Sequence, residues 1–146
     1  MYELDEKDIH ILDVLKKNSH LSIGKISRKT GIPIATVHHR IQKLTGNGII
    51  RSYTIDIDEV KLGRKMIAFV MVKVAKKSDQ SVLLHKIVKH DLVKEGAMIT
   101  GEFDLIFKVR VKDMDDLNNL VVKYIRGLEE VAETRTYVSY EYVEHE

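Results

Sequence analysis

The spacing of apolar residues changes near the middle of the chain, and this change limits the folds that the chain can adopt. Through residue 45, apolar residues recur at three- and four-residue intervals, which is the period of an amphipathic helix. From residue 65 onward, short apolar runs typical of strands alternate with helical stretches in the order β-α-β-β-α-β. We therefore expect an α+β protein in which a helical domain precedes a ferredoxin-like sheet domain.

The helical part is predicted to contain three helices. Asp5 is a suitable N-cap for the first, with Asp8 as an acidic first-turn partner, and this helix is expected to end near residue 18. Ser22 caps a second helix at residues 23–30, and Gly31 provides the left-handed turn after it. A third helix is expected from residue 33 or 34 to residue 45. The last two helices and their turn predict a helix-turn-helix, similar to that of winged-helix domains.

Charge is segregated along the chain. Residues 14–55 contain no Asp or Glu but eight Lys or Arg, whereas five acids precede this stretch and seventeen follow it. The net charge of +2 alone would not indicate a nucleic-acid partner. A compact helical unit without acids predicts a surface that binds a polyanion, and double-stranded DNA is the expected partner.

The third helix has two distinct faces. Val37, Ile41 and Leu44 follow the spacing of a buried stripe. The opposite face and its flanks carry small side chains first and polar or basic ones later, which suits a major groove. With two residues at the start of the preceding helix, the expected DNA contacts are Ser22, Lys25, Ala35, Thr36, His38, His39, Arg40, Gln42 and Lys43.

Residues 49–57 alternate apolar and polar side chains and predict a strand. A polar connection follows. We therefore place a helix-turn-helix domain at residues 1–49, a linking strand and hinge at 50–63, and a ferredoxin-like domain at 64–146.

In the ferredoxin-like domain, strands are expected at residues 66–75, 93–100, 103–111 and 131–143. Helices are expected at 78–89 and after Asp113, which is a suitable cap. The first strand is apolar on both faces, with Ile67, Phe69 and Met71 on the second. Helices can cover only one side of a four-stranded sheet, so we expect the sheet of another copy to cover the other in a homodimer.

In this order and spacing, four segments resemble the Lrp/AsnC (leucine-responsive/asparagine-responsive) transcription regulators. They are LDEKDIHILDVLKKNSHLS, GNGIIRSYTIDID, EGAMITGEFDLIFKVRVKD and EEVAETRTYVSY. The resemblance implies a linking strand that pairs across the dimer, dimers that assemble into octamers, and a C-terminal domain that binds amino-acid effectors. One departure is visible: Pro33 occupies the position where members commonly have Ser, and Pro cannot offer a capping hydroxyl.

The resemblance also implies an effector site near a Thr-Gly-x-x-Asp loop, in clefts between dimers. Carried over to this chain, the loop comprises Thr100, Gly101, Glu102, Phe103 and Asp104, and Thr134 and Thr136 are added as candidates. The residues alone leave two alternatives open. The loop is also what an ordinary hairpin turn requires, and the two Thr side chains are common strand formers.

Other classes of function find little support. Adjacent His38 and His39 point about 100° apart on a helix and cannot share a metal ion well, and the chain has no Cys. No Ser/His/Asp arrangement, P-loop or paired carboxylate indicates an enzyme. The apolar runs are too short for a transmembrane helix, and the acidic N-terminus is unlike a signal peptide, so we expect a cytoplasmic protein without cofactor or metal.

The expected function is a sequence-specific DNA-binding transcription regulator that senses an amino acid or related metabolite. One alternative is an architectural protein that wraps DNA and has no small-molecule effector. A second is a regulatory or catalytic ferredoxin-like module with an incidental helical appendage, which predicts negligible affinity for DNA.

Overall fold

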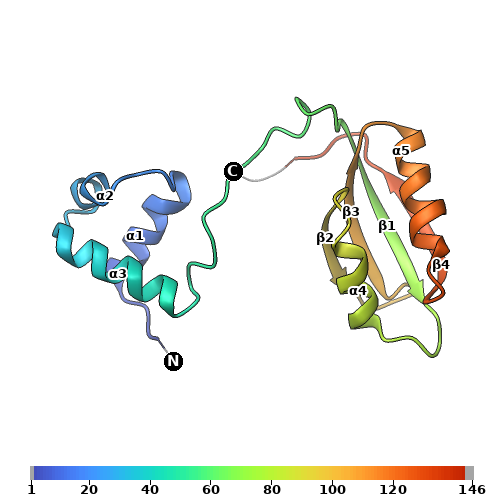
Figure 1. Ribbon diagram of the computed structural model, residues 1–146, viewed down its shortest axis with the longest axis horizontal. Coiled ribbons are helices and arrows are strands. Elements are labelled where there is room, and N and C mark those ends of the chain that lie inside the picture. The colour runs from blue at the N-terminus through green and yellow to red at the C-terminus, as the bar shows by residue number, and fades with distance from the viewer. Residues whose placement is uncertain (1, 144–146) are drawn as a thin grey trace. The chain divides into compact units, whose positions relative to one another are not determined.

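The computed structural model describes residues 2–143. These residues form two compact units, and the division between them falls between residues 56 and 57 (Figure 1). The division falls inside the segment 50–63 that we predicted as linker. Each unit has its own cluster of buried apolar side chains. The chain therefore carries two separate cores, as the change in apolar spacing indicated.

The N-terminal unit contains helices α1 (Glu6–Lys17), α2 (Ile23–Thr30) and α3 (Ile34–Gly46). Asp5 and Asp8 form a reciprocal capping box at the start of α1, and the Ser22 side chain caps α2. Gly31 ends α2 with a φ of +72°, the left-handed conformation that Gly adopts without steric cost. The predicted helices and caps are confirmed. Their apolar faces meet in a small core of Ile11, Leu15, Ile26, Ile32, Val37 and Leu44.

The predicted strand at residues 49–57 is wrong for the single chain. Residues 51–58 have no regular secondary structure, and within the described chain no backbone hydrogen bond joins residues 51–57 to another segment. The side chains of Tyr53, Ile55 and Ile57 are 53%, 68% and 46% exposed. An alternating sequence becomes a strand only when a neighbouring strand accepts its hydrogen bonds, and residues 2–143 supply no such neighbour here.

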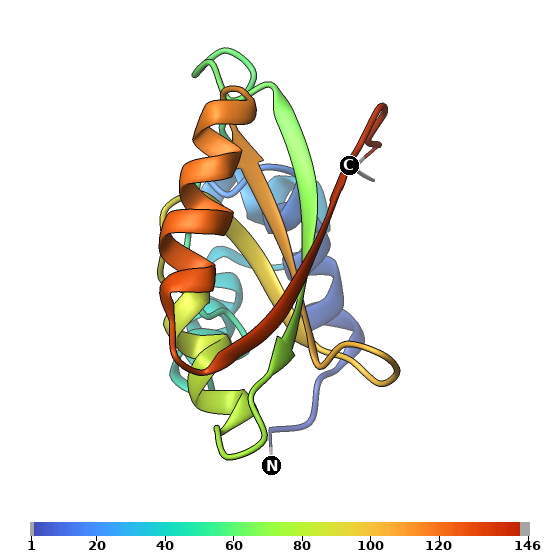
Figure 2. The same cartoon turned by 90° about the vertical axis from the view of Figure 1, so that its right-hand side faces the viewer.

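The C-terminal unit is a four-stranded antiparallel sheet in the order β2-β3-β1-β4, with two helices on one face (Figure 2). Its strands are β1 (Met66–Val74), β2 (Val93–Met98), β3 (Leu105–Val111) and β4 (Val131–Val138). Helix α4 (Gln80–Val88) follows β1. Between β3 and β4 lies a helix of three parts, α5 (Met114–Asn118), a π-helical turn (Asn119–Tyr124) and a 3-10 turn (Ile125–Gly127). This is the predicted ferredoxin-like arrangement.

Several boundaries differ from the predictions. Helix α4 begins after Asp79, whose carboxylate accepts hydrogen bonds from two backbone N–H groups. β2 ends at Met98 and β3 begins only at Leu105, so the turn between them is longer than expected. β4 ends at Val138, which pairs with Ala68 of β1, and not at residue 143; beyond Val138, the Ser139 backbone N–H still donates to the Ile67 carbonyl at 2.9 Å.

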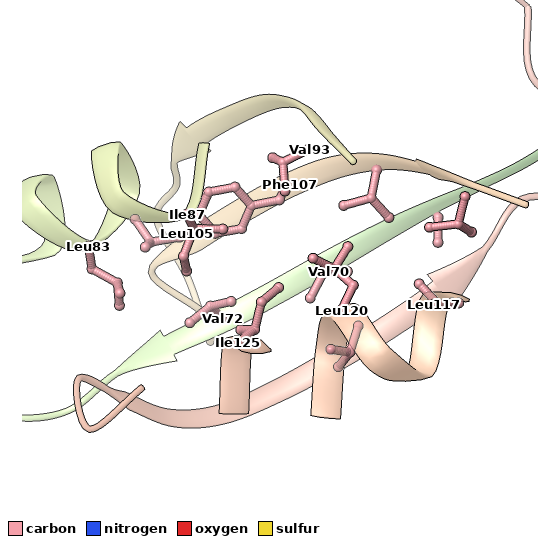
Figure 3. Packing of buried hydrophobic residues seen from close by; sticks show 14 residues of the cluster. Val70, Val72, Leu83, Ile87, Val93, Leu105, Phe107, Leu117, Leu120 and Ile125 are labelled. Atoms are coloured by element: carbon pink, nitrogen blue, oxygen red, sulfur yellow. The ribbon is translucent and has the colours of Figure 1, made fainter. Parts of the chain in front are cut away.

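The core of this unit lies between the sheet and its helices (Figure 3). β1 directs Ala68, Val70 and Val72 toward the helices, and all three are fully buried. They pack with buried side chains from β2, from β3 and from both helices: Leu83, Ile87, Val93, Leu105, Phe107, Val109, Val111, Leu117, Leu120, Val121 and Ile125. Gly96 permits this packing, because a Cβ atom there would lie 2.8 Å from both Phe107 and Val88.

Candidate nucleic-acid interface and effector loop

Helix α3 keeps its predicted polar face free. Val37 and Leu44 are fully buried and Ile41 packs partly against the same core, which fixes the rotation of the helix about its axis. Ala35, His38, His39, Gln42 and Lys43 are exposed, and Thr36 is half-buried. On α2, Ser22 and Lys25 are also exposed, although the Ser22 hydroxyl accepts a hydrogen bond of 3.4 Å from the Lys25 backbone N–H. These eight predicted DNA contacts are therefore accessible.

Arg40 differs from the other predicted DNA contacts because its guanidinium is occupied within the unit. Its Nη1 atom donates to Asp5 at 2.6 Å and to Asp8 at 2.8 Å. The Asp8 side chain is 1% exposed and also accepts from the Tyr2 hydroxyl at 2.9 Å. Asp5 accepts the Asp8 backbone N–H as well as Arg40, and both bonds hold its pKa below the ordinary value. Arg40 thus joins the start of α1 to α3 and is a structural anchor here.

This anchor could not be deduced from the sequence. Asp8 looks like an ordinary first-turn acid, and Arg40 projects to the flank of the polar face of α3. Their pairing depends on how α1 and α3 cross, which local spacing does not reveal.

Helix α3 begins where predicted although Pro33 offers no capping hydroxyl. The helix begins at Ile34, and Pro33 stands at the N-cap position without a side-chain hydrogen bond to the first turn. The first two side chains of the helix, Ile34 and Ala35, are both exposed. The missing hydroxyl therefore leaves the helix start in place but without a cap from its own chain.

The Thr100–Asp104 loop of the C-terminal unit is held by its own side chains. The Asp104 carboxylate accepts the backbone N–H of Val74 at 2.7 Å and the Gln80 amide at 3.1 Å. Phe103 is 2% exposed. Gly101 has a φ of +127°, which only Gly adopts readily. Three of the five predicted loop residues thus have structural roles, whereas Thr100 and Glu102 are exposed.

Arg135 is a loop partner that the sequence analysis did not identify. Its guanidinium lies 4.9 Å from the centre of the Phe103 ring and 3.1 Å from a carboxylate oxygen of Glu102. Arg135 is opposite Met71 in the β1–β4 ladder. It therefore belongs to the face of the sheet that the helices leave open, and it connects that face with the loop.

Thr134 and Thr136 are not brought together with the loop on that face. They lie opposite Val72 and Val70, whose side chains point toward the helices. The Thr134 hydroxyl accepts a hydrogen bond of 2.7 Å from Arg126, which lies on the helical side. Side chains alternate between the faces of a strand and Arg135 stands between these two Thr, so within the single chain they lie on the opposite face from Arg135.

The face of the sheet that the helices leave open carries apolar and charged side chains, and other residues of the same unit contact some of them. Phe69 packs against Tyr142 with 6.2 Å between the ring centres, and the Lys108 ammonium donates to the Tyr142 hydroxyl at 2.9 Å. Lys108 also pairs with Glu95 at 2.9 Å. Residues that follow β4 therefore contact part of the face for which we predicted a second copy.

The described residues contain neither a metal-binding cluster nor a membrane-spanning helix. No group of three or more His, Cys, Asp or Glu in this part of the chain is arranged to hold a metal ion. Among the same residues, no helix combines the length and apolar character that crossing a membrane requires.

Comparison with known protein families assigns both units. Residues 4–51 match the winged helix-turn-helix DNA-binding family, and residues 67–146, more than half of the chain, match the Lrp/AsnC ligand-binding domain. The chain belongs to the Lrp/AsnC family of transcription regulators. It is a DNA-binding helix-turn-helix regulator with a ligand-binding domain of the Lrp/AsnC type, which confirms the resemblance seen in the sequence.

The curated relatives are named as regulators. An uncharacterised HTH-type transcriptional regulator of Pyrococcus furiosus is 34% identical over 145 residues, covering 98% of this chain and 97% of the relative. The regulatory protein AsnC of Haemophilus influenzae is 27% identical, covering 95% of this chain and 93% of its own. Because the named relatives are transcription regulators, the expectation that the chain is not an enzyme is confirmed.

Solved Lrp/AsnC structures share the fold over nearly the whole chain. Escherichia coli AsnC is 25% identical, with a TM-score of 0.89, covering 99% of this chain and 97% of that one. A transcriptional regulator of Neisseria meningitidis, solved as a complex with L-Met, is 24% identical, with a TM-score of 0.90 and coverage of 98% and 94%.

Proposed function

We propose that this Lrp/AsnC protein binds double-stranded DNA sequence-specifically through α3, as a cytoplasmic homodimer or a larger assembly. The observation that supports this most is the free polar face of α3 on a unit whose acids lie outside residues 14–55. The buried stripe of α3 faces its own core, so a ligand that meets the helix meets its small, polar and basic side chains. A major groove accepts such a face.

The side chains divide into two roles. Gln42 and His39 carry donors and acceptors for base edges, and Ala35 and Thr36 carry methyl groups, so these residues supply sequence preference. Lys25 and Lys43 carry flexible charges and supply phosphate contacts, which strengthen binding to any sequence. Arg40 is left out of both groups, because its guanidinium bonds to Asp5 and Asp8.

Homodimer formation has two supporting observations. Tyr53, Ile55 and Ile57 alternate on an exposed segment that has no strand partner among the described residues. The open face of the sheet presents Phe69 and Met71, both only partly buried. A second copy can provide the missing strand and cover the remaining apolar surface, and pairs of dimers can then assemble further, up to the octamer.

The C-terminal unit is proposed to sense an amino acid or a related metabolite at the Thr100–Asp104 loop. The exposed residues Thr100 and Gly101 and the Glu102–Arg135 salt bridge offer groups that match an ammonium and a carboxylate. Binding would alter how dimers assemble and hence the spacing of the DNA-binding units. The L-Met complex of a protein with this fold makes methionine the first probe.

An architectural DNA-wrapping protein without an effector is the second candidate. It is favoured by the internal use of Asp104, whose carboxylate already bonds to Val74 and Gln80, and by the burial of Phe103. In that case the loop only closes the β2–β3 turn.

Selection of duplexes from a random library at fixed salt, followed by sequencing, tests the DNA-binding proposal. An enriched two-fold motif supports it, and a pool without any enriched motif contradicts sequence-specific binding. Gln42→Ala should change preference at particular bases, whereas Lys43→Ala should weaken binding to all sequences to a similar degree.

Calorimetry with the twenty amino acids, methionine first, separates the two candidates for the C-terminal unit. Heat of binding together with a changed elution volume supports an effector. No binding and no change in assembly favours the architectural candidate. Glu102→Gln is the matched variant, because Glu102 is exposed and its loss should remove ligand binding without unfolding the loop.

A further inference from the structure

Ile34 is the one branched aliphatic side chain of α3 that the protein core leaves exposed. Val37 and Leu44 are fully buried and Ile41 is partly buried, but Ile34 is 59% exposed. A large apolar side chain at the first helical position is therefore not held there by the packing of the N-terminal unit.

The helix start does not explain Ile34 either. β-branched residues are weak helix formers, and Pro33 before it provides no capping hydrogen bond. Ala35 after it is exposed as well. The first turn of the recognition helix thus presents an apolar tip, on a unit whose remaining free surface along α2 and α3 is polar or basic.

A recognition helix enters the major groove with its N-terminal residues toward the base edges. In that groove the 5-methyl group of thymine is the only apolar feature of a base pair, and apolar side chains recognise it. We infer that Ile34 contacts the 5-methyl group of one thymine in each half-site and thereby selects thymine over cytosine at that position.

This inference rests on the proposed binding of DNA through α3. It goes further, because it names a base, an atom and a residue that the polar-face assignment does not include. The partner is a nucleic acid rather than another protein, because the surrounding acid-free surface carries exposed Lys25, Arg28, Lys29 and Lys43 and suits a polyanion. An apolar contact alone would not require that charge.

Single replacement of thymine by uracil in the selected duplex tests the contact, because uracil keeps the pairing and lacks only the methyl group. The full-length protein should lose about fourfold in affinity at one position per half-site, the effect expected for one buried methyl group. In the Ile34→Ala protein the same replacement should have no effect. Ile34→Val keeps a branched side chain and should retain most of the discrimination.

Ile9→Ala is the matched control, because Ile9 is an exposed aliphatic residue on α1 rather than α3. It should leave the response to uracil unchanged. Far-UV circular dichroism should show the same helix content in both Ala proteins, and their affinities should fall equally with salt, because neither substitution removes a charge.

Three results overturn the inference, and they differ from a failure of the proposed function. If the protein binds its selected duplex but tolerates uracil at every position, Ile34 reads no methyl group. If the Ile34→Ala protein remains sensitive, another side chain makes the contact. If Ile34→Ala changes the elution volume instead, the side chain serves a protein interface. Absence of any DNA binding would remove the proposed function and this inference together.

Discussion

The polar face of α3 and the Thr100–Asp104 loop differ in how much of their chemistry is free. Eight of the nine predicted contacts on α2 and α3 are accessible, and only Arg40 is bound by neighbouring side chains. In the loop, Asp104 and Phe103 hold the turn itself. A helix needs only one face for packing and leaves the other for a ligand, whereas a tight turn uses polar side chains to satisfy its own backbone.

The two units also reach stability by different means. The N-terminal unit has a small apolar core and joins α1 to α3 through Arg40 and two carboxylates. The C-terminal unit depends on close apolar packing around Phe107 and Gly96. We therefore expect charge substitutions to affect the first unit most, and volume substitutions the second.

The largest effect is expected from Gly96→Ala. The added Cβ would lie 2.8 Å from the Phe107 ring and from Val88, so side chains of the core would have to move. The free energy of unfolding of the C-terminal unit should fall by about 3 kcal/mol. Urea denaturation measures this loss, and hydrogen exchange should show that residues of α1–α3 keep their protection.

Gly24→Ala in α2 is the control, because a Cβ there meets no atom within 4 Å. It should raise the stability of the N-terminal unit by about 0.5–1 kcal/mol, as expected for Ala in a helix. Equal destabilisation by both substitutions would contradict the assignment of close packing to the C-terminal unit.

The next largest loss of stability is expected from Arg40→Met. It leaves the buried Asp8 carboxylate without its cation and should cost the N-terminal unit about 2 kcal/mol. Lys43→Met is the matched change on the exposed face of the same helix, and thermal unfolding should hardly detect it. The order should be reversed for DNA binding: when both proteins are compared below their melting temperatures, Lys43→Met should lose more affinity for DNA than Arg40→Met. If Lys43→Met destabilises the unit and Arg40→Met does not, the assignment of Arg40 as the structural anchor and of Lys43 as the DNA contact is contradicted.

Asp104→Ala should have a smaller effect on stability. It removes the acceptor of the Val74 N–H bond and of the Gln80 amide, at a cost of about 1–2 kcal/mol. Asp104→Asn keeps an acceptor and should cost less. Chemical denaturation without any ligand provides the test. An Asp104→Ala protein of unchanged stability would mean that the carboxylate is free for an effector, and the contrast with α3 would disappear.

The smallest expected effect is the loss of stability of the C-terminal unit at acidic pH. The hydrogen bond from Lys94 and a second from Arg64 hold the pKa of Glu59 below its ordinary value. Glu59 is therefore expected to stabilise the C-terminal unit above its unfolded-state pKa, and this contribution is lost as pH falls through the lower pKa of the folded state. Stability measured from neutral pH down to about pH 3 should fall more for the natural protein than for Glu59→Gln. Parallel curves would contradict the role of Lys94.

Local chemistry was predictable from the sequence. The Asp5–Asp8 capping box, the Ser22 cap and the left-handed Gly31 each depend on residues within a few positions of one another. The order of strands and helices followed from apolar spacing, because each element must bury one face. The polar face of α3 could be projected for the same reason.

Contacts between distant residues were not predictable in this way. Arg40 meets residues 32 and 35 positions away, and Asp104 meets Gln80 24 positions away. The strand expected at residues 49–57 requires a partner strand that the described part of the chain does not supply. The face of the sheet that Thr134 occupies was not predictable either, because the register of β4 against β1 decides it.

The salt dependence of DNA affinity tests the central claim most directly, namely that the acid-free surface of α2 and α3 binds the DNA backbone. We predict that the logarithm of affinity for the selected duplex falls steeply and linearly with the logarithm of salt concentration. Lys43→Ala should make the slope shallower by about one for each bound copy of the chain, whereas Ile34→Ala should not change it. An affinity that does not respond to salt, or a slope that Lys43→Ala leaves unchanged, would contradict the claim.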